Sequence, residues 1–460
     1  MIFERIRSEG LAHISYLIGS SEEAAVIDPR RDCQVYLNLS KRKDLKIKYI
    51  FETHRNEDYA IGSVELANLT SAKIYHGPGL DFKYGETLRD GQELHLDALK
   101  LTAIHTPGHT DESMSYALAD PTTGEDTVMV FTGDTLFVGD VGRTDLYGAK
   151  EAPRLAGNLY DSIFNKILPL GDGVIICPAH SGGSICGRAI SRREESTLGL
   201  ERVQNHALQK KNRDAFIQFK TAEHLEIPPY FRMMERYNLE GPPLLGHLPR
   251  PSHLTAVEFQ KHIESGAVVV DTRSPPAFGG GHIQGSYNIW LGGIPSFAGW
   301  ILPYDRPILL VLEDVREVDE AVRYLVRLGY DRVEGFLRTE KSGGVEAWYD
   351  KAQPVEHLRL LTVQELRERL NRGENLLVLD VRSDEEWDEY HIESATHIYF
   401  GHLEERASEL PKDKPIVVIC NVGIRSSLGS SILLKKGYRD IYNVLGSMTA
   451  WRNAGYPVVK

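Results

Sequence analysis

Short apolar runs alternate with turn-rich polar segments over the first 190 or so residues. The run AVIDP ends at an Asp-Pro pair, and GVIICPAHS is an apolar run that ends in a polar loop. The segment MSYALADPTTGEDTVMVFTGD holds two apolar runs around a turn-rich centre, which predicts a β-hairpin. From about residue 190 to 235 the pattern becomes helical and charged. These patterns predict a mixed α/β region followed by a helical extension.

An internal repeat fills the chain beyond a segment rich in Pro and Gly. VVVDTRSPPAFGGGHIQGSYNI (268–289) matches LVLDVRSDEEWDEYHIESATHI (377–398), and residues 307–330 match residues 415–438. Each copy alternates apolar runs with helix-like segments, which is typical of a parallel sheet with crossover helices. We therefore predict four parts: 1–239, a linker at 240–251, and α/β domains at 252–356 and 358–460.

Composition and charge exclude several classes of partner. The 460 residues carry a formal net charge of −12 without a basic tract, so we expect neither nucleic acid nor membrane as a partner. The N-terminus lacks the apolar core of a secretory signal. The four cysteines lack C-x-x-C spacing, which fits a reducing compartment. We expect a cytoplasmic protein that forms a homo-oligomer.

One cysteine of the second copy has the surroundings of a reactive thiol. Cys420 ends an apolar run and precedes the loop NVGIR and the helix-like SSLGSSILLKKG. Backbone N–H groups at a helix start favour a thiolate, Gly423 permits a tight loop, and Arg425 adds a positive charge. The alternative is a buried cysteine that closes a strand, and the loop favours the reactive thiol.

The second copy resembles a rhodanese domain, a sulfurtransferase, over about 358–460. The resemblance rests on DVRSDEEWDEYHIESATHI, CNVGIRS and GSMTAWRNAGYPV. It implies that Cys420 carries sulfane sulfur as a persulfide and that Gly423 and Arg425 lie beside the substrate. In the first copy Leu312 stands at the cysteine position and Glu317 at the arginine position. We therefore interpret 252–356 as an inactive rhodanese-like domain with a structural role.

Metal-ligand side chains follow several apolar runs of the N-terminal region. ETHRNEDY (52–59) comes after LKIKYIF, and HTPGHT (105–110), FTGDTLF (131–137) and CPAHS (177–181) repeat the arrangement. Ligands at strand ends are held rigidly while the loops leave coordination positions open. The order of these elements resembles the metallo-β-lactamase fold over about 1–190, and this implies an αββα sandwich.

The resemblance implies ligands at two metal positions. The first keeps two histidines and a bridging aspartate: His54, His109 and Asp134. The second keeps two residues besides that aspartate: Asp58 and His180. Each position lacks one motif histidine, because the chain has Asn56 and Tyr59 instead. Two histidines and one carboxylate form the facial triad of non-haem Fe(II) oxygenases, so we expect one Fe(II) per chain. The roles of Asp58 and His180 stay open.

Three further residues of the N-terminal region have alternative roles. Arg143, in VGDVGRTD, would bind a carboxylate of a thiol tripeptide, and the alternative is an ion pair with Asp145 or Asp140. Cys177 and Cys186 are expected to be buried and without a catalytic role.

Both resemblances indicate chemistry of sulfane sulfur. A persulfide dioxygenase of the metallo-β-lactamase superfamily would oxidise a thiol persulfide, of glutathione, coenzyme A or a similar thiol, with O2 to sulfite. The rhodanese domain would pass sulfur to sulfite and give thiosulfate, as in fused proteins of bacterial sulfide detoxification. One alternative is a zinc thioester hydrolase of the glyoxalase II kind with an attached sulfurtransferase. The other is a sulfur carrier or sensor with a vestigial metal site.

Overall fold

The computed structural model describes residues 1–124, 126–223, 225–338 and 344–460. The chain divides into two compact units. The first holds Met1–Leu248 with Val326–Gly329, and the second holds Pro249–Leu325 with Tyr330–Lys460. The boundary near residue 248 falls between helix α6 (Phe231–Glu240) and strand β12 (Ser252–Leu254), inside the segment predicted as a linker. The two repeat copies belong to one unit.

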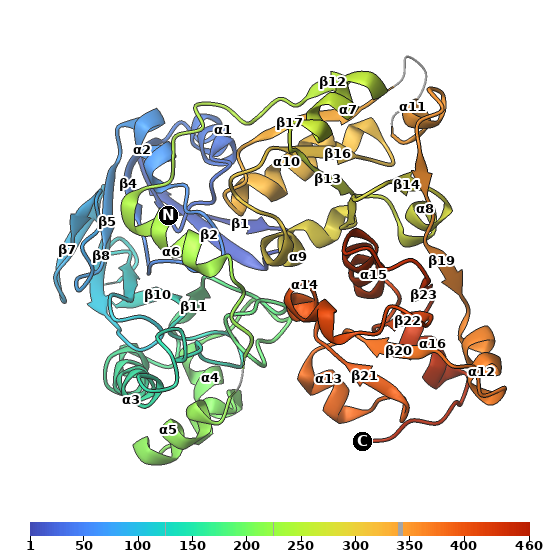
Figure 1. The fold of residues 1–460 in the computed structure, drawn as a ribbon. Helices are drawn as coiled ribbons and strands as arrows, with labels where there is room; N and C mark the ends of the chain where they lie inside the picture. The colour runs from blue at the N-terminus through green and yellow to red at the C-terminus, as the bar shows by residue number, and fades with distance from the viewer. Residues whose placement is uncertain (125, 224, 339–343) are drawn as a thin grey trace. The chain divides into compact units, whose positions relative to one another are not determined.

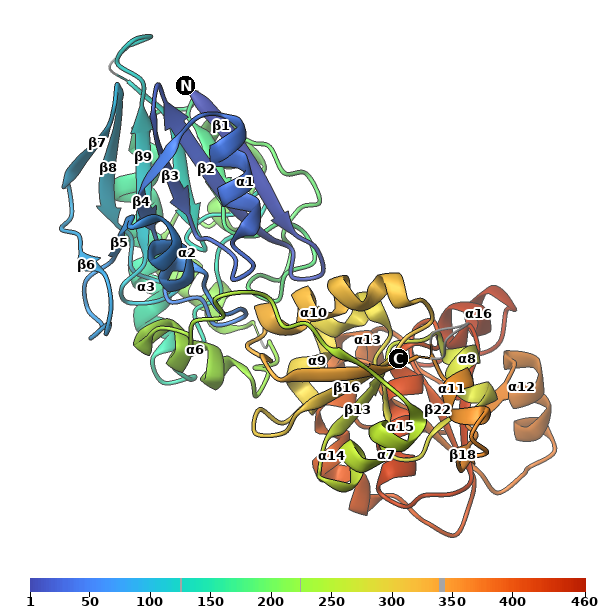
Figure 2. The same cartoon turned by 90° about the horizontal axis from the view of Figure 1, so that it is seen from above.

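The first unit contains two mixed sheets (Figures 1 and 2). The first sheet is six-stranded and follows chain order: β1 (Ile2–Ser8), β2 (His13–Ser20), β3 (Glu23–Ile27), β4 (Lys46–Phe51), β5 (Lys73–His76) and β6 (Glu86–Thr87). The second is five-stranded, in the order β11 (Ile175–Pro178), β10 (Thr127–Gly133), β9 (Met114–Ala119), β8 (Leu99–His105) and β7 (Glu93–Leu96). Strands β9 and β10 pair antiparallel, which confirms the predicted hairpin.

Three apolar layers show how the two sheets are covered. Phe51 and Leu101 share the core between the sheets. The outer face of the first sheet packs on α1 (Gln34–Arg42) and α2 (Ser63–Thr70) through residues such as Tyr36 and Leu66. The second sheet packs on these helical segments: α3 (Ala152–Ser162), the π-helix Ile163–Ile167, the 3-10 turns Leu168–Leu170 and Ala207–Gln209, α4 (Leu198–Gln204) and α5 (Arg213–Thr221). The first unit is therefore the expected αββα sandwich.

The second unit holds two five-stranded sheets whose paired strands all run parallel. The first has the order β12, β17 (Val333–Leu337), β16 (Ile308–Val311), β13 (Val268–Asp271) and β15 (Tyr287–Asn288). The other has the order β19 (Arg359–Leu361), β23 (Ile441–Val444), β22 (Ile416–Ile419), β20 (Leu377–Asp380) and β21 (Ala395–His397). A separate two-stranded pair joins β14 (His282–Ile283) and β18 (Val355–Glu356). These sheets confirm the predicted parallel topology.

Helices connect the strands of both copies. The first copy has α7 (Ala256–Glu264), α8 (Pro275–Gly280), α9 (Ile294–Ile301), α10 (Val318–Arg327), α11 (Glu346–Tyr349) and the turns Leu291–Gly293 and Val315–Glu317. The second has α12 (Val363–Asn371), α13 (Asp384–Glu389), α14 (Leu403–Arg406), α15 (Arg425–Lys435), α16 (Ser447–Asn453) and the turns Phe400–His402 and Ala407–Glu409. Within the described ranges, the helices are too short or too polar to cross a membrane.

Matching residues of the repeat form the same ion pair in both copies. Arg273 makes a bidentate ion pair with Asp271, and Arg382 makes the same pair with Asp380. All four side chains are buried, so each pair fixes the loop that follows its central strand. The repeat in the sequence therefore corresponds to a repeat in the structure.

Candidate functional site

A cluster of acidic, imidazole and thiol side chains lies in the loops that follow the strands of the first unit. His54 follows β4, His109 follows β8, Asp134 follows β10 and His180 follows β11. We call the full set the ligand cluster: His54, Glu57, Asp58, His109, Asp134, His180 and Cys186. Each of these side chains is 2% exposed or less. Seven side chains that can bind a metal ion are thus buried together in one part of the first unit.

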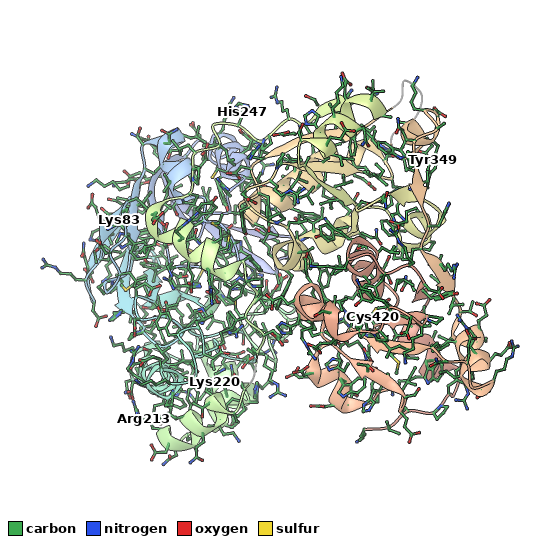
Figure 3. All side chains as sticks on the ribbon, in the orientation of Figure 1. Lys83, Arg213, Lys220, His247, Tyr349 and Cys420 are labelled. Carbon is green, nitrogen blue, oxygen red and sulfur yellow. The ribbon has the colours of Figure 1, made fainter. Side chains whose placement is uncertain are left out.

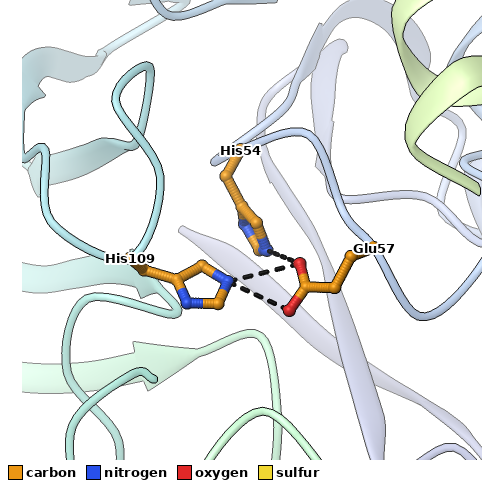
Figure 4. Close-up of side chains that lie close together, drawn as sticks. All are labelled: His54, Glu57 and His109. Carbon is orange, nitrogen blue, oxygen red and sulfur yellow. Dashed lines mark hydrogen bonds and ion pairs between the residues drawn. The ribbon is translucent and has the colours of Figure 1, made fainter. Parts of the chain in front are cut away.

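Two imidazoles of the cluster converge on two carboxylates. His109 Nε2 lies 3.2 Å from Glu57 Oε1, and His54 Nε2 lies 3.8 Å from Glu57 Oε2 (Figure 4). Asp134 Oδ2 lies 3.8 Å from His54 Nε2 and 3.6 Å from His109 Nε2. The structure thus brings His54, His109 and Asp134 together. It adds Glu57, which the motif comparison missed, although an acidic residue beside the deviant Asn56 was a signal.

Hydrogen bonds orient both imidazoles toward the carboxylates. The Thr53 hydroxyl donates to Asp28 at 2.7 Å, so the His54 Nδ1–H donates to Thr53 Oγ1 at 2.9 Å. The His109 Nδ1–H donates to the Arg143 carbonyl at 2.9 Å. Each ring therefore presents Nε2 to the cluster, as metal-binding histidines do.

His180 is held between two carboxylates. Its Nδ1 lies 2.8 Å from Asp134 Oδ1, and its Nε2 lies 3.0 Å from Asp58 Oδ2. Burial lowers the pKa of His180, but Asp134 and Asp58 together raise it well above its ordinary value. Asp58 and His180 therefore form an ion pair in which each balances the charge of the other.

The two residues that replace motif histidines are bound to the surrounding loop. The Asn56 side-chain amide donates to the His54 carbonyl at 3.2 Å. The Tyr59 ring packs against His13, with centroids 4.1 Å apart. The buried Asn238 of α6 donates to the carbonyls of both residues, at 2.6 and 2.8 Å. His13 and Asn238 were not identified from the sequence.

The ligand cluster fits a divalent metal ion. Within the described part of the chain, three of its buried atoms lack a hydrogen-bond partner: His54 Nε2, Asp58 Oδ1 and Asp134 Oδ2. Neighbouring ligands at about 2.1 Å from one ion lie about 3.0–3.4 Å apart, which is close to the spacings around Glu57. Ligand atoms within 4.8 Å of one another form three groups: His54–Glu57–His109, Asp58–His180–Cys186 and Glu57–Asp134–Cys186.

The structure shows the contacts of Arg143 and of the two cysteines of this region. The five N–H donors of Arg143 contact Asp145, at 2.6 and 2.9 Å, and the carbonyls of Ile185, Leu225 and Glu226. Arg143 is therefore engaged in the alternative ion pair rather than free for a substrate carboxylate. Cys177 and Cys186 are buried as expected, but Cys186 Sγ lies 3.4 Å from Glu57 Oε1 and belongs to the ligand cluster.

The loop after β22 places a backbone donor on the Cys420 sulfur (Figure 3 labels Cys420). The Gly423 N–H donates to Cys420 Sγ at 3.1 Å, and a φ of 96° at Gly423 suits glycine. Ser426 Oγ lies 3.4 Å from the sulfur, but its single proton has a closer acceptor in Asn443 Oδ1, at 2.6 Å. A backbone amide at the start of α15 thus faces the thiol, which favours a thiolate.

Arg425 has a carboxylate partner beside this loop. Its guanidinium makes two hydrogen bonds to Glu386, at 2.6 and 2.7 Å. Burial lowers the Arg425 pKa, but the contacts with Glu386 raise it overall. The charge of Arg425 is therefore balanced by Glu386.

The first copy has a leucine where the second has Cys420. Strand β16 pairs with β13 as β22 pairs with β20, so Leu312 follows β16 as Cys420 follows β22. Leu312 is buried, and the turn after it begins with Glu313 and Asp314. At this position the first copy presents a hydrocarbon side chain followed by acidic groups.

Replacing Thr53 with valine should weaken metal binding. The change keeps the shape of the side chain but removes the acceptor that holds the His54 Nδ1–H. Loss of such a partner typically costs 10- to 100-fold in metal affinity, so we expect about that range. Chelator competition measures it. Thr106→Val is the matched control, because this buried hydroxyl contacts Ser115 and Thr135 rather than the cluster. Equal affinities of Thr53→Val and the control would contradict the orienting role.

Each of the two units matches a known protein family. Residues 9–180 match the metallo-beta-lactamase superfamily, and residues 255–351 and 362–454 each match the rhodanese-like domain. The metallo-beta-lactamase fold binds metal, and the matches together indicate an enzyme.

Individual relatives cover different shares of the chain. A metallo-beta-lactamase structure from Staphylococcus aureus is 31% identical, covers 73% of this chain and 98% of its own, and has a TM-score of 0.66. The structure of ETHE1 from Myxococcus xanthus is 28% identical, covers 52% of this chain and 98% of its own, and has a TM-score of 0.45.

Among curated proteins, the cytoplasmic hydroxyacylglutathione hydrolase of Saccharomyces cerevisiae is 32% identical over 143 residues, which are 29% of this chain and 52% of the yeast enzyme. The chain spans about half the length of the curated relatives it matches. The family matches and the S. aureus structure agree with the αββα unit, its ligand cluster and the repeated parallel sheets. The chain therefore belongs to the metallo-beta-lactamase superfamily and carries two rhodanese-like domains.

Proposed function

We propose that the chain is a persulfide dioxygenase joined to a sulfurtransferase. The first unit would convert a persulfide of glutathione, coenzyme A or a similar thiol, with O2 and water, into the free thiol, sulfite and two protons. The second unit would transfer sulfane sulfur through Cys420 to sulfite and release thiosulfate. The observation that carries the proposal is the convergence of His54 and His109 on buried carboxylates, in one chain with a cysteine whose sulfur accepts from the Gly423 N–H.

His54, His109 and a carboxylate would hold one Fe(II). When bound by these residues, the ion would supply the activation of O2 that oxidation of the persulfide sulfur requires. Thr53 and the Arg143 carbonyl keep the two imidazoles turned toward the ion. Burial of the ligand cluster excludes bulk water, which would protect a reactive sulfur species from side reactions. The pair of Asp58 and His180 would hold Asp134 in place.

Cys420 would act in two transfers that conserve its thiolate. The thiolate attacks the outer sulfur of a persulfide, an S–S bond forms on Cys420, and the donor leaves as a thiol. Sulfite then attacks the outer sulfur of the Cys420 persulfide, which gives thiosulfate and restores the thiolate. The Gly423 N–H would stabilise the negative sulfur in both steps. Production of sulfite in the same chain would raise its local concentration.

A zinc thioester hydrolase with an attached sulfurtransferase is the second candidate. The similarity to a hydroxyacylglutathione hydrolase favours it, as do the Asp58–His180–Cys186 donors, which could hold a second ion. Metal analysis of the full chain purified without added metal separates the two candidates. About one iron per chain supports the dioxygenase. About two zinc ions per chain, with cleavage of S-lactoylglutathione, would support the hydrolase instead.

The cysteine-less copy would stabilise the transfer loop. Its buried Asn288 accepts from Ser427 Oγ at 2.6 Å, and the Asn288 N–H donates to Ser431 Oγ at 3.2 Å. Both serines lie on α15, directly after the Cys420 loop. Asn288 thus ties the first copy to the helix that positions the reactive thiol.

Replacing Asn288 with alanine should therefore destabilise the second unit. The buried Ser427 hydroxyl loses its acceptor, which costs about 1–3 kcal/mol. Thermal unfolding followed by calorimetry measures the change in the transition of this unit. Asn371→Ala, at the exposed end of α12, is the control and should leave the transition unchanged. Identical transitions for both variants would contradict the supporting role.

A further inference from the structure

We infer that Glu57 is a metal ligand that takes the place of the imidazole missing at Asn56. The ion would then be held primarily by His54, Glu57 and His109, and Asp134 would be shared with His180. The inference rests on the metal site of the proposed function and specifies which carboxylate completes it.

Distances favour Glu57 over Asp134 as the principal carboxylate. The Glu57 carboxylate lies 3.2 Å from His109 Nε2, whereas Asp134 lies 3.6 Å from the same atom. Both carboxylates lie 3.8 Å from His54 Nε2. One Asp134 oxygen is already engaged by the His180 Nδ1–H, at 2.8 Å. Glu57 is therefore the carboxylate closer to both imidazoles taken together.

The buried carboxylate of Glu57 would be stabilised by a bound cation. Glu57 is fully buried, and its described polar contacts are His54, His109 and the Cys186 thiol. A buried carboxylate is costly unless it is paired or coordinates a metal. The His54 Nε2 atom that faces it is buried and lacks a hydrogen-bond partner among the described residues. A divalent ion between these groups would satisfy both the carboxylate and the imidazole.

The loop backbone is fixed on both sides of Glu57. Asn238 donates to the carbonyls of Asn56 and Tyr59, and its Oδ1 accepts from the Ile61 N–H at 2.9 Å. The Asn56 amide nitrogen is bound to the His54 carbonyl. The change from histidine at position 56 is thus accompanied by an acidic neighbour held in a defined position.

The test is metal affinity of the full chain, measured by anaerobic chelator competition with Fe(II) and by titration with Co(II). We expect Glu57→Gln to weaken binding of both ions by roughly 100-fold or more, because loss of a ligand should exceed the 10- to 100-fold cost of losing an outer partner. Glu57→Asp keeps the charge, so its metal affinity should lie between that of the wild type and that of Glu57→Gln. Circular dichroism checks that the variants are folded.

The matched control is Glu112→Gln. Glu112 is also buried and accepts from the Arg55 N–H of the same loop, at 2.9 Å, but it belongs to none of the ligand groups found in the described chain. We expect the metal affinity of Glu112→Gln to stay within about threefold of the wild type, since contacts outside the ligand set contribute less to metal affinity than the ligands do. Unchanged affinity of Glu57→Gln overturns the inference, as does a cobalt–thiolate absorption band that places Cys186 on the ion instead. The two proposals can fail separately. If iron binding depends on Glu57 but the iron-loaded protein shows no persulfide-dependent O2 uptake, the inference is supported and the proposed function is refuted.

Discussion

Replacing Cys420 with serine should abolish thiosulfate formation and leave O2 consumption unchanged. Serine has nearly the same size, so the hydrogen bonds of the loop can persist, but a hydroxyl cannot carry sulfane sulfur. We expect a loss of at least about 1,000-fold in sulfur transfer to sulfite, because the nucleophile itself is removed. The measurement is thiosulfate formed from glutathione persulfide and sulfite, with O2 uptake recorded in the same sample.

Ser426→Ala is the matched control for Cys420. It removes the hydroxyl 3.4 Å from the sulfur but keeps the thiol and the closer Gly423 N–H. We expect transfer to fall by no more than about tenfold, since one neutral hydrogen bond is worth about 1 kcal/mol. Undiminished thiosulfate formation by Cys420→Ser, with sulfite consumed, would contradict the assignment of the transfer to Cys420.

Replacing His109 with alanine should remove both metal binding and O2 uptake. The imidazole is fully buried, and its Nε2 lies nearest to the Glu57 carboxylate and close to Asp134. Its loss leaves one imidazole in the proposed iron site and removes the nearest partner of the Glu57 carboxylate. We expect less than about a tenth of the wild-type iron content, given that even outer partners cost 10- to 100-fold in affinity. Elemental analysis and an O2 electrode give the two results.

His105→Ala is the control for this change. His105 lies on the same segment, but its Nε2 contacts the Asp111 carbonyl at 2.9 Å rather than the ligand cluster. It should retain iron and O2 uptake. Sulfur transfer through Cys420 should survive in both variants, because this reaction belongs to the second unit. Full iron content in His109→Ala would contradict the assigned site.

Elements defined by local patterns could be predicted from the sequence. The hairpin of β9 and β10 follows from two adjacent apolar runs, and the parallel sheets follow from the alternating runs of the internal repeat. The gathering of His54, His109 and Asp134 could be anticipated because strands of stacked sheets present their loops at the same edge. The grouping of the two copies in one compact unit could not, since it depends on contacts between residues far apart in the sequence.

The residues that were missed or misassigned depend on contacts across long sequence separations. Cys186 approaches Glu57 from 129 residues away, and Asn238 reaches the Asn56 carbonyl across 182 residues. No spacing rule connects such positions. For Arg143 the sequence left two roles open, a substrate carboxylate or an ion pair, and its donors are taken by Asp145 and by carbonyls from a distant loop. A single sequence cannot show which of several acceptors a buried guanidinium will meet.

The most direct measurement is O2 uptake by the full chain after anaerobic loading with Fe(II), with glutathione persulfide as substrate and sulfite determined at the end. The proposed function predicts uptake of one O2 for each sulfite or thiosulfate formed, because the sulfane sulfur of thiosulfate comes from a second persulfide that is consumed without O2. It predicts no uptake by the same protein loaded with zinc. Absence of O2 uptake by protein that holds one iron per chain would contradict the central claim.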